Sequence, residues 1–215
     1  LPLVDLRVRP WYNPALRSST FIVPGIVGIL LTITFLLVMS VAVVREREGG
    51  TLEQLIVTPI SKAALLLGKV VPFIAIAYLQ MTNILVMGWL VFHVPVRGSL
   101  LLLYALTAPF IFATLGLGLL VATVARTQGS AQQLALFFML PSILLSGFIF
   151  PREAMPVAAQ WVGVIVPVTW FLDIMRGILL KGVGMSALWR PTLALIAIAA
   201  VTLTISIRRF AKTVE

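Results

Sequence analysis

Cysteine is absent from the 215 residues, and histidine occurs only once, at His93. These absences exclude a disulfide framework, a thiolate metal site and a histidine-based metal cluster within this sequence. The sequence also lacks the Gly-x4-Gly-Lys-Ser/Thr phosphate-binding loop, the His-Glu-x-x-His zinc motif and the Gly-x-Ser-x-Gly nucleophile motif. We therefore expect no metal, no other cofactor and no enzymatic activity in this chain alone.

Charged residues are scarce as well, at 11% of the chain against about 25% in a typical soluble domain. Residues 21–44, 70–96 and 98–125 contain no Lys, Arg, Asp or Glu. Each stretch is longer than the ~20 residues that a helix needs to cross a ~30 Å hydrocarbon core. The net charge of +9 falls mostly at the ends of apolar runs, where basic side chains meet lipid headgroups. The sequence thus indicates a membrane protein that contacts the lipid bilayer, and we expect no nucleic-acid partner.

The apolar runs predict an all-α, polytopic fold with five full transmembrane helices and one re-entrant helical hairpin. The predicted spans lie at about 21–44, 62–92, 100–124, 134–150 and 191–207. The predicted hairpin covers about 151–172, because Pro151, Glu153, Pro156 and Pro167 break that apolar stretch into two short halves. Residues 173–190 are predicted to form a mixed polar loop.

The first 20 residues are polar, contain Pro2, Pro10 and Pro14, and lack the pattern of a signal peptide. We expect residues 1–20 to be the extracytoplasmic end of a region that starts before Leu1, followed by a transmembrane domain at 21–215. The charge bias leaves the orientation open. The loops on the side of Arg45 carry seven Lys and Arg residues, and the loops on the other side carry eight.

Several polar side chains interrupt the apolar spans. In the second span, a possible lining of a transport pathway consists of Tyr78, Gln80, Thr82, Asn83 and Trp89. The same residues could equally serve helix packing. Asp173 and Arg176 are three residues apart and could form an ion pair on one helix face, at the membrane interface.

The segment from Arg45 to Ser61 is the most informative part of the chain. It has five charges in the nine residues 45–53, which cannot lie in hydrocarbon, and two adjacent glycines at 49 and 50. Residues 51–57 could form a short amphipathic helix, with Thr51 as its N-cap. From the residues alone, this segment is either a solvated loop between two spans or a docking helix for a cytosolic motor protein.

The run from Val44 to Ile60 resembles the signature cytoplasmic segment of ABC-2-type permeases, the membrane subunits of ABC exporters. Motifs similar to the multidrug-export branch of that family occur in order along most of the chain, at Trp11–Pro14, Phe21–Gly25, Leu145–Pro151, Met155–Pro156 and Arg176–Ile178. The resemblance implies a six-span fold, of which this sequence lacks the first helix and most of a large extracytoplasmic region. It also implies a location in the bacterial inner membrane.

The resemblance further implies a dimer with a second permease copy or homologue, and two ABC ATP-binding subunits as partners. A periplasmic adaptor protein is an additional candidate partner. The ATPase-coupling residues implied by the match are Arg45, Glu46, Arg47, Glu48, Gly49, Gly50, Thr51, Glu53 and Gln54.

These observations lead to three functional hypotheses. The first is the permease subunit of an ATP-driven exporter for a drug-like, lipid or other amphiphilic substrate. The second is an ion-coupled secondary transporter or channel that acts without an ATPase, and the third is a scaffold subunit that transports nothing.

Overall fold

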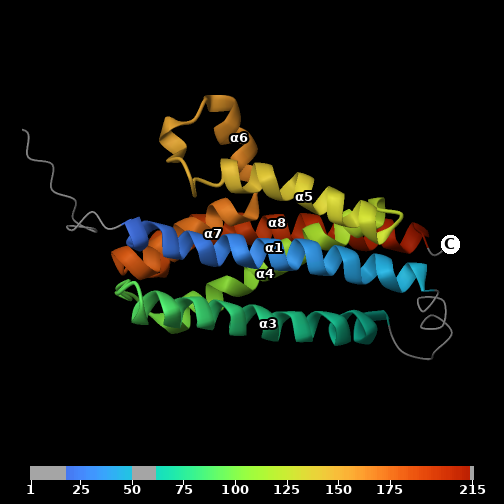
Figure 1. Ribbon diagram of the computed structural model, residues 1–215, viewed down its shortest axis with the longest axis horizontal. Helices are drawn as coiled ribbons and strands as arrows, with labels where there is room; N and C mark the ends of the chain where they lie inside the picture. The colour runs from blue at the N-terminus through green and yellow to red at the C-terminus, as the bar shows by residue number, and fades with distance from the viewer. Residues whose placement is uncertain (1–17, 50–61, 214–215) are drawn as a thin grey trace, which may run out of the picture.

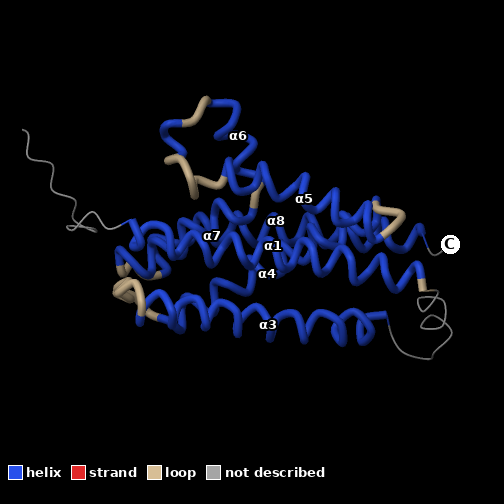
Figure 2. Tube along the Cα trace, viewed as in Figure 1, coloured by secondary structure: helices blue, strands red, loops and turns tan. Residues whose placement is uncertain are grey.

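The computed structural model describes residues 18–49 and 62–213, and within these ranges the regular structure is helical throughout (Figures 1 and 2). The long helices are α1 (Ser18–Glu48), α3 (Lys62–Leu90), α4 (Leu100–Val124), α5 (Gln128–Leu145) and α8 (Met185–Thr213). Between α5 and α8 lie a 3-10 turn (Arg152–Ala154), α6 (Val157–Ile165), α7 (Pro167–Arg176) and a π-helical turn (Gly177–Lys181). The predicted all-α membrane fold is confirmed.

Helix α4 forms the centre of the bundle because small residues let two other helices approach it. A Cβ atom on Gly118 would lie 2.9 Å from the carbonyl oxygen of Phe35 in α1. A Cβ atom on Gly116 would lie only 2.3 Å from Oγ1 of Thr202 in α8. The hydroxyl of Ser206 donates a hydrogen bond to the Gly116 carbonyl at 2.9 Å. These close approaches hold α1, α4 and α8 together through backbone contact, as small residues do in membrane proteins.

Helix α3 lies along one side of the bundle and is much less buried than its neighbours (Figure 1). Only 17% of its most apolar stretch is buried, against 50% for α1 and for α4. Large apolar side chains such as Leu79 and Met87 are exposed on it. This face of α3 is therefore available to lipid or to another membrane helix.

Within residues 18–49 and 62–213, four helices are long and apolar enough to cross a membrane, namely α1, α3, α4 and α8. The number is five if the bent pair of α6 with α7 and the π-helical turn counts as one span. The structure differs from the prediction at the span expected over residues 134–150. Helix α5 has 18 residues, about 27 Å at ~1.5 Å per residue, and its first turns are polar. The chain then leaves the helix after Leu145 through a turn in which Gly147 has a φ of +83°.

The predicted hairpin appears as two short helices with an 89° bend between Ile165 and Pro167. Proline suits the start of α7, because the backbone N–H that proline lacks would have no partner within the first turn of a helix. The helical structure runs beyond the predicted end at 172, so the loop predicted at 173–190 is wrong. The cause is burial. The side chains of Ile174, Met175, Ile178 and Leu179 are fully enclosed, and only a helix satisfies their backbone at that depth.

Candidate functional site

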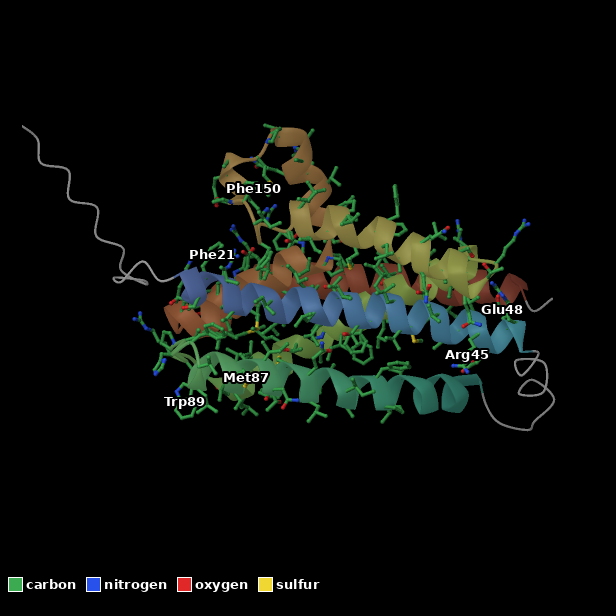
Figure 3. The ribbon with its side chains drawn as sticks, viewed as in Figure 1. Phe21, Arg45, Glu48, Met87, Trp89 and Phe150 are labelled. Carbon is green, nitrogen blue, oxygen red and sulfur yellow. The ribbon has the colours of Figure 1, made fainter. Side chains whose placement is uncertain are left out.

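The carboxyl end of α1 meets the turn between α4 and α5, and we call this end of the bundle the inner end. This junction contains the described part of the predicted coupling segment. Side chains Arg45 and Glu48 lie at this end of the bundle, opposite the end with Phe21 and Trp89 (Figure 3). Arg45, Glu46, Arg47, Glu48 and Gly49 are described. The remaining predicted coupling residues, Gly50, Thr51, Glu53 and Gln54, lie outside the described residues.

Arg47 binds the carboxyl end of α4. Its guanidinium donates to the carbonyl oxygen of Ala122 at 3.4 Å and to the carbonyl oxygen of Ala125. Carbonyl groups in the last turn of a helix have no partner within the helix and carry the negative end of its dipole. A guanidinium at this place supplies both hydrogen-bond donors and the favourable charge.

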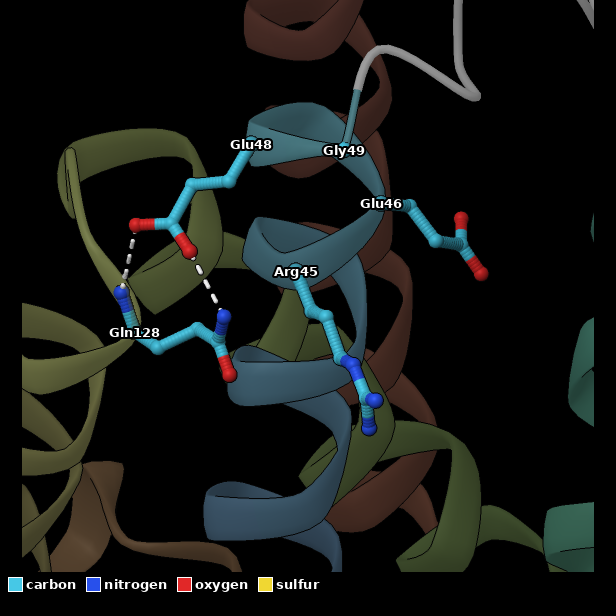
Figure 4. A pocket seen from close by; sticks show the side chains of 5 residues that line it. All are labelled: Arg45, Glu46, Glu48, Gly49 and Gln128. Carbon is cyan, nitrogen blue, oxygen red and sulfur yellow. Dashed lines mark hydrogen bonds between the residues drawn. The ribbon is translucent and has the colours of Figure 1, made fainter.

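Glu48 binds the amino end of α5. One carboxylate oxygen accepts from the backbone N–H of Gln128 at 3.2 Å, and the other accepts from the side-chain amide of Gln128 at 2.6 Å (Figure 4). Gln128 is the first residue of α5, so its N–H is one of those left unpaired by the helix. A carboxylate at this position is also favoured by the positive end of the helix dipole.

The turn that receives these two side chains is itself well defined. Thr127 and Ser130 form a capping box, in which the Thr127 hydroxyl accepts from the Ser130 N–H at 3.1 Å and the Ser130 hydroxyl accepts from the Thr127 N–H at 2.9 Å. The Ser130 hydroxyl also accepts from the Arg126 N–H at 3.1 Å. The turn is therefore held by its own hydrogen bonds as well as by α1.

Arg45 and Glu46 point away from Gln128, in directions different from that of Glu48 (Figure 4). Together with Glu48, Gly49 and Gln128 they line a surface pocket of about 480 Å³. The charged residues that the sequence grouped as one set therefore divide in the structure. Arg47 and Glu48 bind neighbouring helices, and Arg45, Glu46 and Glu48 border a pocket at the end of the molecule.

The predicted pathway residues also divide into separate groups. Tyr78 and Thr82 face α4, where the Tyr78 hydroxyl donates to the Tyr104 carbonyl at 3.1 Å and the hydroxyls of Thr82 and Tyr104 lie 2.5 Å apart. The rings of Tyr78 and Tyr104 stack with centroids 5.6 Å apart. These polar groups tie α3 to α4.

Gln80, Asn83 and Trp89 lie elsewhere on α3. The Gln80 amide donates to Thr34 of α1 at 3.2 Å, which ties α3 to a second helix. Asn83 is exposed, and Trp89 is exposed at the far end of the helix, beside a pocket lined also by Leu90, His93, Val94 and Pro95. Within this one chain, the five residues therefore do not share a single surface, and their role as a pathway lining stays a prediction.

At the opposite end of the bundle, which we call the outer end, Arg176 donates to the Gly147 carbonyl at 3.1 Å and covers the Phe21 ring at 3.8 Å. These two contacts hold the guanidinium, and a direct ion pair with Asp173 is not among the contacts of the described residues. Of the predicted hairpin residues, Pro151, Glu153 and Pro156 lie in the segment between α5 and α6, and Pro167 begins α7.

The sequence did not reveal the partners of these side chains. The partners are far apart along the chain. Arg47 and Ala122 are separated by 75 residues, and Glu48 and Gln128 by 80. The only local signal was the Thr127–Ser130 spacing, which is typical of a helix start.

Comparison with known proteins identifies the family. Residues 3–208 match the family described as ABC-2 family transporter protein, and the chain belongs to it. With its long apolar helices, it is thus an ABC-2 permease, a multi-pass protein of the inner membrane. The description of this family names it as a transporter family.

Three relatives from Escherichia coli (strain K12) illustrate the match. The chain is 41% identical over 182 residues to the probable multidrug ABC transporter permease YbhS, covering 84% of this chain and 48% of the relative. It is 38% identical over 198 residues to the probable multidrug ABC transporter permease YbhR, covering 92% and 54%. It is 33% identical over 216 residues to the inner membrane transport permease YhhJ, covering 99% and 57%. The chain therefore spans about half the length of these relatives.

Proposed function

We propose that this chain is part of the permease subunit of an ATP-driven exporter, which works with a separate ABC ATP-binding subunit and a second permease. The substrate is an amphiphilic molecule, either drug-like or lipid. Membership of the ABC-2 family supports the transport role, and the names of two relatives, both probable multidrug permeases, support the substrate class.

The observation that carries the proposal is the arrangement at the inner end of α1. The charged run that resembles the coupling segment begins on the last turn of this helix, and Arg45, Glu46 and Glu48 border an open pocket there. The same turn is bonded to α4 and α5 through Arg47 and Glu48. Force applied by a motor protein on the segment after Gly49 would therefore act on three helices and not on one.

The exposed face of α3 supports the proposed substrate class. It combines bulky apolar residues such as Leu79 and Met87 with the amide of Asn83 and the indole of Trp89. Such a mixture suits an amphiphilic molecule, which needs apolar contact over most of its surface and a few polar contacts for orientation.

The test is reconstitution of the full-length permease in liposomes with and without its co-purified ATPase. We expect transport of amphiphilic dyes only with the ATPase and ATP. Glu53→Lys reverses a charge in the predicted coupling segment, and we expect it to abolish transport while the permease remains inserted. Arg190→Glu, a charge reversal at an exposed position of α8, is the control. Transport driven by an ion gradient without any ATPase would instead support the secondary-transporter alternative.

A further inference from the structure

We propose that Arg47 and Glu48 are positioning residues that make the α4–α5 turn move as one unit with the inner end of α1. This inference rests on the proposed function. It differs from the family resemblance, which implies that Glu48 belongs to the surface that contacts the ATPase. In the structure, the Glu48 carboxylate is already engaged within the permease by two hydrogen bonds to Gln128.

The first step of the argument is that two consecutive residues reach two different helix ends. Neighbouring residues in an α-helix point about 100° apart around the axis, because ~3.6 residues complete a turn. Arg47 is thereby directed at the end of α4 and Glu48 at the start of α5. A rotation or shift of the last turn of α1 that moves one of these side chains away from its partner also displaces the other. The two contacts together therefore fix both the position and the rotation of that turn.

The second step is that each contact has the charge that its helix end prefers. The cationic Arg47 lies on carbonyl groups at the negative end of α4, and the anionic Glu48 lies at the positive end of α5. Hydrogen bonds that involve an ionised group are stronger than neutral ones. Exchanging the two residues would reverse both preferences, so the order Arg–Glu matters as well as the composition.

The third step is that the receiving turn is stiff. The hydrogen bonds between Thr127 and Ser130, together with the contact of Ser130 with Arg126, leave the turn little freedom of its own. A displacement of α1 is therefore passed on to α4 and α5 and is not absorbed by the turn. Helix α3 follows the coupling segment in the chain. It is tied to the bundle by a few polar contacts farther along its length, such as the hydrogen bond from Gln80 to Thr34.

The consequence is a division of labour within the charged run. Arg45, Glu46 and Glu48 border the surface pocket, whereas Arg47 and Glu48 carry motion to the rest of the bundle. Loss of the Glu48 contact is thus expected to leave ATPase binding intact and to reduce the amount of substrate moved for each ATP hydrolysed.

The first experiment measures this ratio in the reconstituted complex. Gln128→Glu places two carboxylates against each other, and we expect a several-fold fall in transport per ATP with unchanged co-purification of the ATPase. The double variant Glu48→Gln with Gln128→Glu recreates the pair with its members exchanged, and we expect the ratio to recover. Gln132→Glu, the same change one turn later on the exposed side of α5, is the control and should leave the ratio unchanged.

Two results would overturn the proposal. One is failure of the exchanged pair to recover any of the ratio lost in Gln128→Glu. The other is loss of ATPase co-purification in Glu48→Ala, which would make Glu48 a docking residue.

A second experiment needs no ATPase and so separates failure of this inference from failure of the proposed function. The 215 residues contain no cysteine, so spin labels can be attached at Gly49→Cys and Gly129→Cys of the full-length permease in nanodiscs, after replacement of any cysteine elsewhere in it. We expect a narrow distance distribution, which broadens when Glu48→Ala or Arg47→Met is added and stays narrow with Gln132→Glu, on the exposed side of α5. A distribution that is equally narrow in all variants would show that the two residues do not hold the turn.

Discussion

The guanidinium of Arg176 lies over the ring of Phe21, with its central carbon 3.8 Å from the ring centroid. This contact joins α7 to the first turn of α1. The same guanidinium donates to the carbonyl of Gly147, in the turn that leaves α5. One side chain thereby connects three segments at the outer end of the bundle, as Arg47 and Glu48 connect three helices at the inner end.

Replacement of Arg176 should therefore loosen the outer end. We expect Arg176→Met to lower the free energy of unfolding by about 1–3 kcal/mol, because it removes a charged hydrogen bond and a cation–π contact together. Thermal unfolding of the detergent-solubilised permease measures the effect. Arg190→Met is the control, because Arg190 is exposed. Within the described part of the chain, its only cation–π contact is with the neighbouring Trp189 ring. An equal loss of stability in both variants would contradict this prediction.

Gly25 is required where α1 passes the turn after α5. A Cβ atom at this position would lie 2.1 Å from Cδ2 of the Phe148 ring. We expect Gly25→Ala to destabilise the protein by about 1–3 kcal/mol through overpacking. Adding Phe148→Ala should bring a further loss smaller than that of Phe148→Ala alone, because the clash is gone.

Gly68→Ala provides the matched control for Gly25→Ala. Among the described residues, no atom outside the local helix backbone lies within 4 Å of a Cβ built on Gly68, so alanine should be neutral or slightly stabilising in that helix. A Gly25→Ala variant as stable as the Gly68→Ala variant would show that the ring of Phe148 moves aside without cost.

The hydroxyls of Thr82 and Tyr104 form a polar tie between α3 and α4, 2.5 Å apart. Tyr104→Phe removes this bond but keeps the ring that stacks on Tyr78. A double-mutant cycle with Thr82→Val should give a coupling energy of roughly 0.6 kcal/mol, and at most about 1.7 kcal/mol, the range found for hydrogen bonds between membrane helices. Additive effects of the two substitutions would indicate that the hydroxyls do not interact.

The bend between α6 and α7 is held by two side chains of α7. The Trp170 indole donates to the carbonyl of Val164 and the Thr169 hydroxyl donates to the carbonyl of Gly163, both at 2.8 Å. Trp170→Phe should leave the Val164 carbonyl without this donor, and we expect faster amide hydrogen exchange in residues 157–165. Trp189→Phe, the same change at an exposed site on α8, should leave the exchange of that segment unaltered.

Much of the fold was predictable because membrane insertion depends on local properties of the chain. Long uncharged runs predicted α1, α3, α4 and α8, and the prolines at 151, 156 and 167 predicted a broken segment between α5 and α8. The structure differs from the expected bounds at 134–150, where the helix is Gln128–Leu145, and the loop expected at 173–190 is wrong, because buried Ile178 and Leu179 extend a helix that looked polar. In both places the difference arose because the apolar content of a short window does not say which side of a helix is covered by neighbours.

The candidate site was predictable only in part. The dense charges from Arg45 to Glu53 indicated an aqueous segment, but they gave no means of separating Arg47 and Glu48 from Arg45 and Glu46. That separation depends on which direction each side chain takes from the last turn of α1 and on what lies there. Gln128 and the carbonyl groups at the end of α4 have no special sequence pattern, because any residue offers a backbone carbonyl.

The sequence by itself determined that this protein is a helical membrane protein and where its main spans lie, since these follow from hydropathy and charge along one dimension. It also carried the family motifs. Only the tertiary structure decided which helix ends are bonded to each other, how α3 differs from the rest in burial, and that the hairpin is tied to α1 through Arg176 and Phe21. The physical reason is that these are contacts between residues distant in the chain, and their geometry is set by packing of the whole bundle.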